Sequence, residues 1–107
     1  MTLKIVVLAS IKKGKEDRLR ELAKWVSGEI KATELDVSHY EMFVADRDKE
    51  GTKEGVVYLH IKDEEAFVRR RELGHHKEFA GVVEKEGLLE TPLRYLKLTD
   101  IVDEWHR

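Results

Sequence analysis

Two adjacent histidines, His75 and His76, follow Gly74 in the stretch LGHHKEF. Imidazoles can bind a metal, carry protons or contact a ligand. Zinc sites on helices use histidines four positions apart, whereas adjacent helical positions point about 100° away from each other. We therefore expect the two rings to diverge, with His75 turned towards the core or a pocket and His76 beside it. We expect no metal at this pair.

His75 has a chemical and a structural interpretation. The positive end of a helix dipole favours a neutral imidazole, and a neutral imidazole can take a proton from a phenol as a general base. The structural alternative is a histidine that only borders the core or caps the turn. Tyr40 poses the same choice, since its hydroxyl could donate to a ligand oxygen or its ring could simply fill space.

Composition excludes several function classes. The 107 residues predict one domain, 1–107, and 20 Lys and Arg against 22 Asp and Glu give no basic face for nucleic acid. Cysteine is absent and no apolar run is long enough to cross a membrane, so we expect no thiolate chemistry, no membrane partner and a cytoplasmic protein. Asparagine and glutamine are absent while 39% of residues are charged, which predicts a thermophilic source.

The first half of the chain predicts a strand, a helix and a second strand. The run LKIVVLASI (3–11) is apolar and β-branched, as in a buried strand. After Gly14, a helical stripe of apolar residues follows at Leu19, Leu22, Ala23, Val26 and Ile30. Residues 36–46 alternate as a strand does, and 46–55 form a polar turn region.

The second half predicts a strand, two helical pieces and another strand. Strand 56–62 leads to Asp63, which we expect to cap a helix that Gly74 ends. A short helix, about 75–86, is closed by Gly87, and 92–98 is the fourth strand. The tail 99–107 is ambiguous between a fifth strand and a helical turn.

The order β-α-β-β-α-β predicts an α+β, ferredoxin-like (split βαβ) fold with a four-stranded antiparallel sheet. Its core would span 3–99, with 100–107 as a C-terminal tail. Helices would cover one face of the sheet. The other face needs a cover as well, so we expect a homodimer that packs sheet to sheet.

The stretch VVYLHIKDEEAFVRRRELGHHKEF resembles the antibiotic biosynthesis monooxygenase (ABM) family, as do IVVLASIKKGKEDRLRELAKWV, Tyr40 and PLRYLKL. The resemblance implies a dimeric α/β barrel with a pocket between the helices and the sheet of each subunit. Enzymes of the family are typically cofactor-free oxygenases of quinols or polyphenols, some members cleave haem, and many have no assigned activity. No cofactor is therefore expected.

The resemblance carries His75, with Phe79 close behind it, onto the family's histidine after the helix break. The family's Tyr-Glu-x-Trp falls on Tyr58, Leu59, His60 and Ile61, so its Glu and Trp are aliphatic here. The family register turns Leu59 and Ile61 towards the helices, and Tyr58 and His60 towards the dimer interface. The absence of asparagine argues against haem cleavage.

The arginine run Arg69–Arg71 resembles an anion binder, but three consecutive arginines fan around a helix and cannot converge. We expect them to form solvated ion pairs. Arg70 is the exception, because it falls where relatives can have histidine and could enter the pocket to bind an anionic ligand.

Two functional hypotheses follow. In the first, the protein is a cofactor-independent monooxygenase of a small aromatic or quinol substrate. His75 is its base, Tyr40 and Arg70 hold substrate oxygens, and Val7, Leu59, Ile61 and Phe79 form the pocket wall. In the second, it is a non-catalytic dimeric barrel that binds a small ligand.

Overall fold

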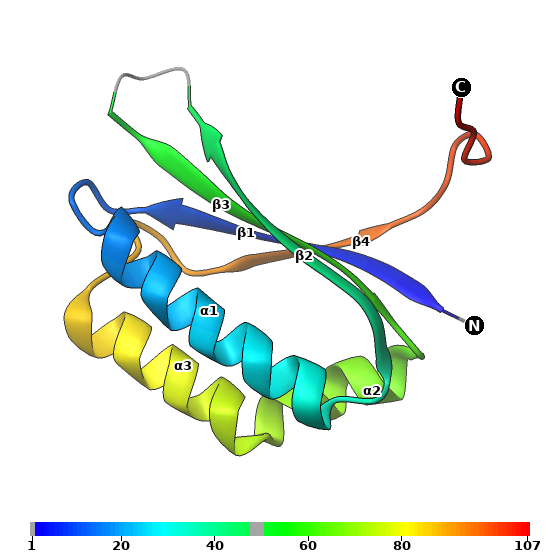
Figure 1. Cartoon of the computed structure of the whole chain (residues 1–107), viewed down its shortest axis with the longest axis horizontal. Helices are drawn as coiled ribbons and strands as arrows, with labels where there is room; N and C mark the ends of the chain where they lie inside the picture. Colours follow the sequence, from blue (N-terminus) through cyan, green and yellow to red (C-terminus); the bar gives the residue numbers. More distant parts are fainter. Residues whose placement is uncertain (1, 48–50) are drawn as a thin grey trace.

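The computed structural model describes residues 2–47 and 51–107. One antiparallel sheet carries the fold, with its strands in the order β2-β3-β1-β4 (Figure 1). The elements follow the chain as β1 (Leu3–Ile11), α1 (Glu16–Thr33), β2 (Val37–Asp46), β3 (Lys53–Ile61), α2 (Glu64–Arg69), the 3-10 turn η1 (Arg70–Glu72), α3 (Gly74–Glu86) and β4 (Arg94–Leu98). This arrangement confirms the predicted α+β ferredoxin-like fold.

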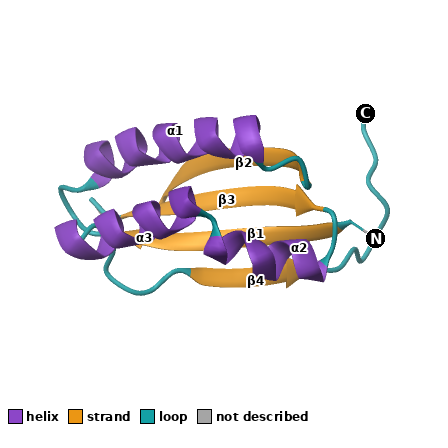
Figure 2. Ribbon diagram, turned by 90° about the horizontal axis from the view of Figure 1, so that it is seen from below, coloured by secondary structure: helices purple, strands orange, loops and turns teal. Residues whose placement is uncertain are grey.

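The helices all lie on one face of the sheet (Figure 2). The central strands β1 and β3 present apolar side chains to them, and Ile5, Leu59 and Ile61 are at most 1% exposed. Because side chains alternate along a strand, their neighbours Val6, Tyr58 and His60 point to the other face. The predicted facing of Leu59 and Ile61 towards the helices is therefore confirmed.

Helix α1 buries the stripe that the sequence indicates. Its buried residues are Leu19, Leu22, Ala23, Val26 and Ile30. Glu16 and Asp17 in its first turn and Lys31 in its last complement the helix dipole. The helix therefore lies flat over the sheet, alongside α3 (Figure 1).

Two predicted helix boundaries are confirmed. The Asp63 side chain accepts a hydrogen bond from the Ala66 backbone N–H at 2.8 Å, as an N-cap does. Gly87 ends α3 with φ +59°, a left-handed conformation that an L side chain rarely adopts.

Other boundaries differ from prediction. Strand β3 begins at Lys53 rather than at 56, because Lys53 to Gly55 still pair with β2; of the predicted turn 46–55, residues 48–50 lie outside the described part. Helix α2 ends at Arg69, and Gly74 begins α3 instead of ending α2. The tail 99–107 forms neither a strand nor a helix and runs away from the sheet (Figure 1).

The face of the sheet opposite the helices has an apolar centre flanked by polar residues. It carries Val6 and Leu8 from β1 and, by register, Val56, Tyr58 and Leu96 opposite them. The rings of His39, Tyr58 and His60 cluster there, with the His39 and His60 centroids 4.9 Å apart. Leu96 is 48% exposed. No helix in the described ranges is long and apolar enough to cross a membrane.

Candidate active site

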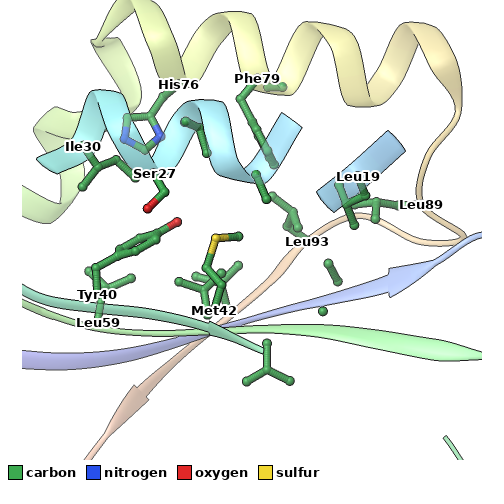
Figure 3. A pocket seen from close by; sticks show the side chains of 18 of the residues that line it. Leu19, Ser27, Ile30, Tyr40, Met42, Leu59, His76, Phe79, Leu89 and Leu93 are labelled. Atoms are coloured by element: carbon green, nitrogen blue, oxygen red, sulfur yellow. The ribbon is translucent and has the colours of Figure 1, made fainter. Parts of the chain in front are cut away.

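A cavity of about 650 Å³ lies between the sheet and the helices α1 and α3 (Figure 3). Its walls are mainly apolar. Val7 and Leu59 come from the central strands, Met42 comes from β2, and Leu19 and Phe79 come from the helices. Such a cavity is large enough for a small aromatic molecule and offers it an apolar environment.

Most residues predicted to form the pocket line this cavity. They are Val7, Tyr40, Leu59, Arg70 and Phe79. Ile61 does not line the cavity; it is buried in the core cluster beside Ile5. Of the adjacent histidines, His76 lines the cavity and His75 does not.

One end of the cavity is polar and is organised by Glu34, the C-cap residue of α1. Its side chain is only 4% exposed. Oε1 accepts a hydrogen bond from Nε of Arg70 at 2.8 Å. Oε2 lies 2.6 Å from Nε2 of His75 and 2.7 Å from Nε2 of His76. One carboxylate therefore joins residues from α1, η1 and α3.

The prediction that His75 and His76 diverge is wrong. Their ring centroids lie 4.6 Å apart, and both Nε2 atoms reach the same oxygen of Glu34. The two Cα–Cβ bonds do point in different directions, but an acceptor placed between those directions is within reach of both rings. Glu34 supplies that acceptor from another helix, which the spacing of the pair alone could not reveal.

Glu34 is ionised in this environment. Burial alone would raise the pKa of the carboxyl group, because it disfavours the charged form. Hydrogen bonds from His76, Arg70 and His75 outweigh burial and lower the pKa of Glu34 from 4.5 to about 2. The carboxylate therefore accepts, and each histidine Nε2 that contacts it is the donor.

Arg70 differs from its neighbours in the arginine run. It is 9% exposed, whereas Arg69 and Arg71 are exposed, and Arg69 pairs with Asp36 and Glu65. This confirms that the run fans out and that Arg70 alone turns inward. Its Nη2 is buried and has no hydrogen-bond partner among the described residues.

Tyr40 projects from β2 into the cavity, with its hydroxyl directed towards α1 (Figure 3). Burial raises the pKa of Tyr40 to about 12. The charge of Arg70 acts against this shift, and the charge of Glu34 adds to it. The hydroxyl is therefore protonated at neutral pH and can donate a hydrogen bond to a ligand oxygen. Ser27 of α1 adds a second hydroxyl to the same side of the cavity.

Glu34, His75 and His76 also have the composition of a metal site. Their candidate ligand atoms lie within 4.8 Å of one another. Among the described residues, no other histidine and carboxylate side chains form such a group. The Arg70 guanidinium, however, is bound to the same carboxylate and would repel a divalent cation. The cluster is better suited to holding protons than to holding a metal.

Sequence reasoning missed Glu34. A weak signal was present, because a carboxylate at the C-terminal end of a helix faces the negative end of the dipole and is unfavourable there. A buried acid in that position needs cationic or donor partners. The partners are distant in the chain, so the signal could indicate that a partner exists but not which residue it is.

The fold is shared with solved structures from several organisms. Rv0793 from Mycobacterium tuberculosis aligns with a TM-score of 0.76 and 16% identity, covering 96% of this chain and 98% of that one. A candidate antibiotic biosynthesis monooxygenase from Nitrosomonas europaea aligns with a TM-score of 0.74 and 16% identity over 94% and 90% of the two chains. Another from Caulobacter crescentus gives 0.76 and 12% over 94% and 91%.

These likenesses define the class of fold. The chain has the ferredoxin-like fold of antibiotic biosynthesis monooxygenases of known structure, as the sequence resemblance implied. At these identities the likeness establishes a shared fold. No model of a protein family matches the sequence, and no curated protein matches it either.

Proposed function

We propose that the protein is a cofactor-independent monooxygenase that acts on a small aromatic substrate of the quinol type. One observation carries the proposal: an apolar cavity ends at a histidine held by an ionised carboxylate, with a neutral tyrosine hydroxyl in the same cavity. The fold shared with proteins described as antibiotic biosynthesis monooxygenases supports it.

The base in this proposal is His76, because it is the histidine of the pair that lines the cavity. Its Nε2 donates to Glu34, which leaves Nδ1 as the nitrogen that can accept a proton. Glu34 also stabilises the imidazolium once the proton has moved. The family resemblance assigned this role to His75. In the structure, His75 does not line the cavity; its Nε2 contacts the same Oε2 of Glu34 as His76 does and helps to hold Glu34 in place.

Tyr40 and the apolar walls position the substrate. The flat ring of a quinol would lie against Leu59 and Phe79, and the neutral Tyr40 hydroxyl would donate to one ring oxygen. Donation to an oxygen that becomes anionic is stronger than donation to a neutral hydroxyl. Tyr40 therefore favours the ionised form that His76 generates.

The reaction balances without an added reductant. Transfer of a quinol proton to His76 gives an electron-rich anion, which reduces dioxygen. One oxygen atom enters a ring C–H bond and the other leaves as water, so a quinol plus dioxygen yields a hydroxyquinone plus water. The four electrons come from the substrate, two from quinol oxidation and two from ring hydroxylation.

We also propose that the protein works as a homodimer through the face of the sheet opposite the helices. That face exposes Leu96 and the edge of the ring cluster His39, Tyr58 and His60. An apolar patch on a sheet face is normally covered by another layer. A second copy of the same chain can supply that layer, so no different protein is needed.

Oxygen uptake with 1,4-dihydroxynaphthalene tests the reaction. We expect uptake above the spontaneous rate, and a reduction of at least tenfold in His76→Ala because general-base catalysis contributes about 10²–10⁴-fold. His106→Ala, in the exposed tail, is the matched control and should retain the full rate. His75→Ala should fall between the two.

A panel of quinols and polyphenols that shows no uptake above background would overturn the proposal. Ligand binding in the cavity without any turnover would then assign the protein to the non-catalytic alternative. Equal rates in His76→Ala and the unmodified protein would remove His76 from the mechanism.

A further inference from the structure

We propose that the cavity selects ligands with an anionic oxygen, such as a carboxylate, and that Nη2 of Arg70 is the donor that binds it. The proposal deepens the proposed function, because it names the chemical class of the molecule that would occupy the same cavity. That the cavity is the ligand site rests on the proposed function. That the ligand is anionic rests on three separate observations.

The first observation is a surplus donor. Arg70 is buried, and its Nε donates a hydrogen bond to Oε1 of Glu34. Its Nη2 is also buried but has no hydrogen-bond partner among the described residues. Buried polar groups in folded proteins nearly always have a partner. Arg70 lines the cavity, so a ligand oxygen can supply the acceptor that the chain itself does not.

The second observation is that Glu34 does not accept a hydrogen bond from Nη2 as well. The carboxylate already receives Arg70 Nε on one oxygen and both histidine rings on the other. The single negative charge is therefore shared among three donor groups. A positive charge that is only partly compensated favours an anionic acceptor over a neutral carbonyl.

The third observation is the charge of the cavity lining. The charged residues that line it are one acid, Glu16, and five cationic residues besides the histidine: Arg20, Lys24, Arg70, Arg71 and Lys77. Glu16 is bound by Arg20 at 2.7 Å. Lys77 is paired with Glu72 at 3.3 Å and Arg70 with Glu34, so Lys24 and Arg71 are the lining cations without a carboxylate partner among the described residues. Their charge attracts anions to the cavity.

The rest of the lining sets the shape of the ligand. Leu59, Met42 and Phe79 offer only apolar contacts. Burying a bare inorganic anion against them would leave most of its hydration unreplaced. The ligand class is therefore an amphipathic molecule with an apolar, ring-sized body and one ionised oxygen group.

Calorimetric titration of the unmodified protein with 2-naphthoate and with 2-naphthamide at pH 7 tests the inference. The two probes share a ring system and differ in charge. We expect naphthoate to bind at least tenfold more tightly. Equal affinities, or tighter binding of the amide, would overturn the proposal without any variant.

Substitution of Arg70 assigns the preference to a residue. Arg70→Met should bring naphthoate down to the affinity of naphthamide, and Arg69→Met, an adjacent arginine that does not line the cavity, should keep the preference. If Arg70→Met does not fold, Arg70→Lys serves instead, because it keeps the charge but lacks the guanidinium fork and should lose most of the preference. A folded Arg70 variant with the full preference would overturn the assignment.

Oxygen uptake separates this inference from the proposed reaction. The comparison uses 1,4-dihydroxy-2-naphthoate and 1,4-dihydroxynaphthalene. Naphthoate selectivity with no oxygen uptake from either quinol would leave the anion site standing and remove the reaction. Uptake from both quinols without selectivity in binding would leave the reaction and remove the anion site.

Discussion

Nε2 of His76 lies 2.7 Å from Oε2 of Glu34, although 42 positions separate the two residues in the chain. The contact joins the start of α3 to the end of α1 at the polar end of the cavity. It makes Glu34 the residue that orients the histidine at the cavity wall. It also leaves Arg70 as a buried cation that depends on the same carboxylate.

Replacing Glu34 should destabilise the fold strongly. Glu34→Gln removes the charge that compensates Arg70, and removing one partner of a buried ion pair costs about 3–5 kcal/mol. Urea unfolding should show a loss of this size. The control is Glu65→Gln, which breaks the exposed pair with Arg69 and should cost less than about 1 kcal/mol. Equal losses in the two variants would contradict the buried role of Glu34.

Acid should destabilise the protein through the same carboxylate. Folding lowers the pKa of Glu34 from 4.5 to about 2, so the folded state binds fewer protons than the unfolded state between these values. The stability that Glu34 contributes is therefore complete above pH 4.5 and is lost as the pH falls towards 2, by roughly 3 kcal/mol. Urea unfolding across this pH range should show a shallower fall in Glu34→Gln than in the unmodified protein. Parallel curves would argue against the shifted pKa.

Tyr40 should lose its proton at a higher pH than an ordinary tyrosine. Its pKa is raised from 10.0 to about 12, so the folded state retains a proton that the unfolded state loses in this range. The stability contributed by neutral Tyr40 is complete below pH 10 and falls as the pH rises to 12. Ultraviolet titration should show a late tyrosinate absorbance that is missing from Tyr40→Phe. A difference spectrum with a midpoint near pH 10 would show that Tyr40 is not shielded.

Tyr40→Phe should also weaken substrate binding. The loss of one hydrogen bond to a substrate oxygen that becomes charged corresponds to about 1.5–3 kcal/mol, or roughly 10- to 150-fold in kcat/KM. Steady-state oxygen uptake measures it. An unaltered kcat/KM would return Tyr40 to the role of a packing residue.

The open face of the sheet should carry the dimer contact. Leu96 is exposed on that face, so Leu96→Arg would place a charge in the proposed interface and should convert a dimer to a monomer. Light scattering coupled to size-exclusion chromatography reads the mass directly. Val68→Arg, at an exposed apolar position of α2, is the control and should remain dimeric. A folded monomer of the unmodified protein at micromolar concentration would contradict the interface.

Much of the fold could be predicted because local patterns encode it. The α1 stripe from Leu19 to Ile30, the Asp63 cap and the Gly87 ending each depend on residues a few positions apart. The alternation in β3 placed Leu59 and Ile61 on one face for the same reason, and the family resemblance indicated that this face is the covered one. Boundaries were less predictable where pairing decided them. Strand β3 extends back to Lys53 because β2 offers partners there.

The candidate site, like the fold, was predictable where local sequence patterns decide it and unpredictable where tertiary packing does. The sequence by itself determined the order of the elements. Its resemblance to the ABM family indicated the apolar wall at Val7, Leu59 and Phe79 and an Arg70 that enters the pocket. Only the tertiary structure decided that Glu34 meets His75, His76 and Arg70, and that His76 is the histidine at the cavity. These contacts join residues 36 to 42 positions apart. A helical period fixes the direction of a side chain on its own element, but the packing of α1 against α3 fixes which side chain it meets.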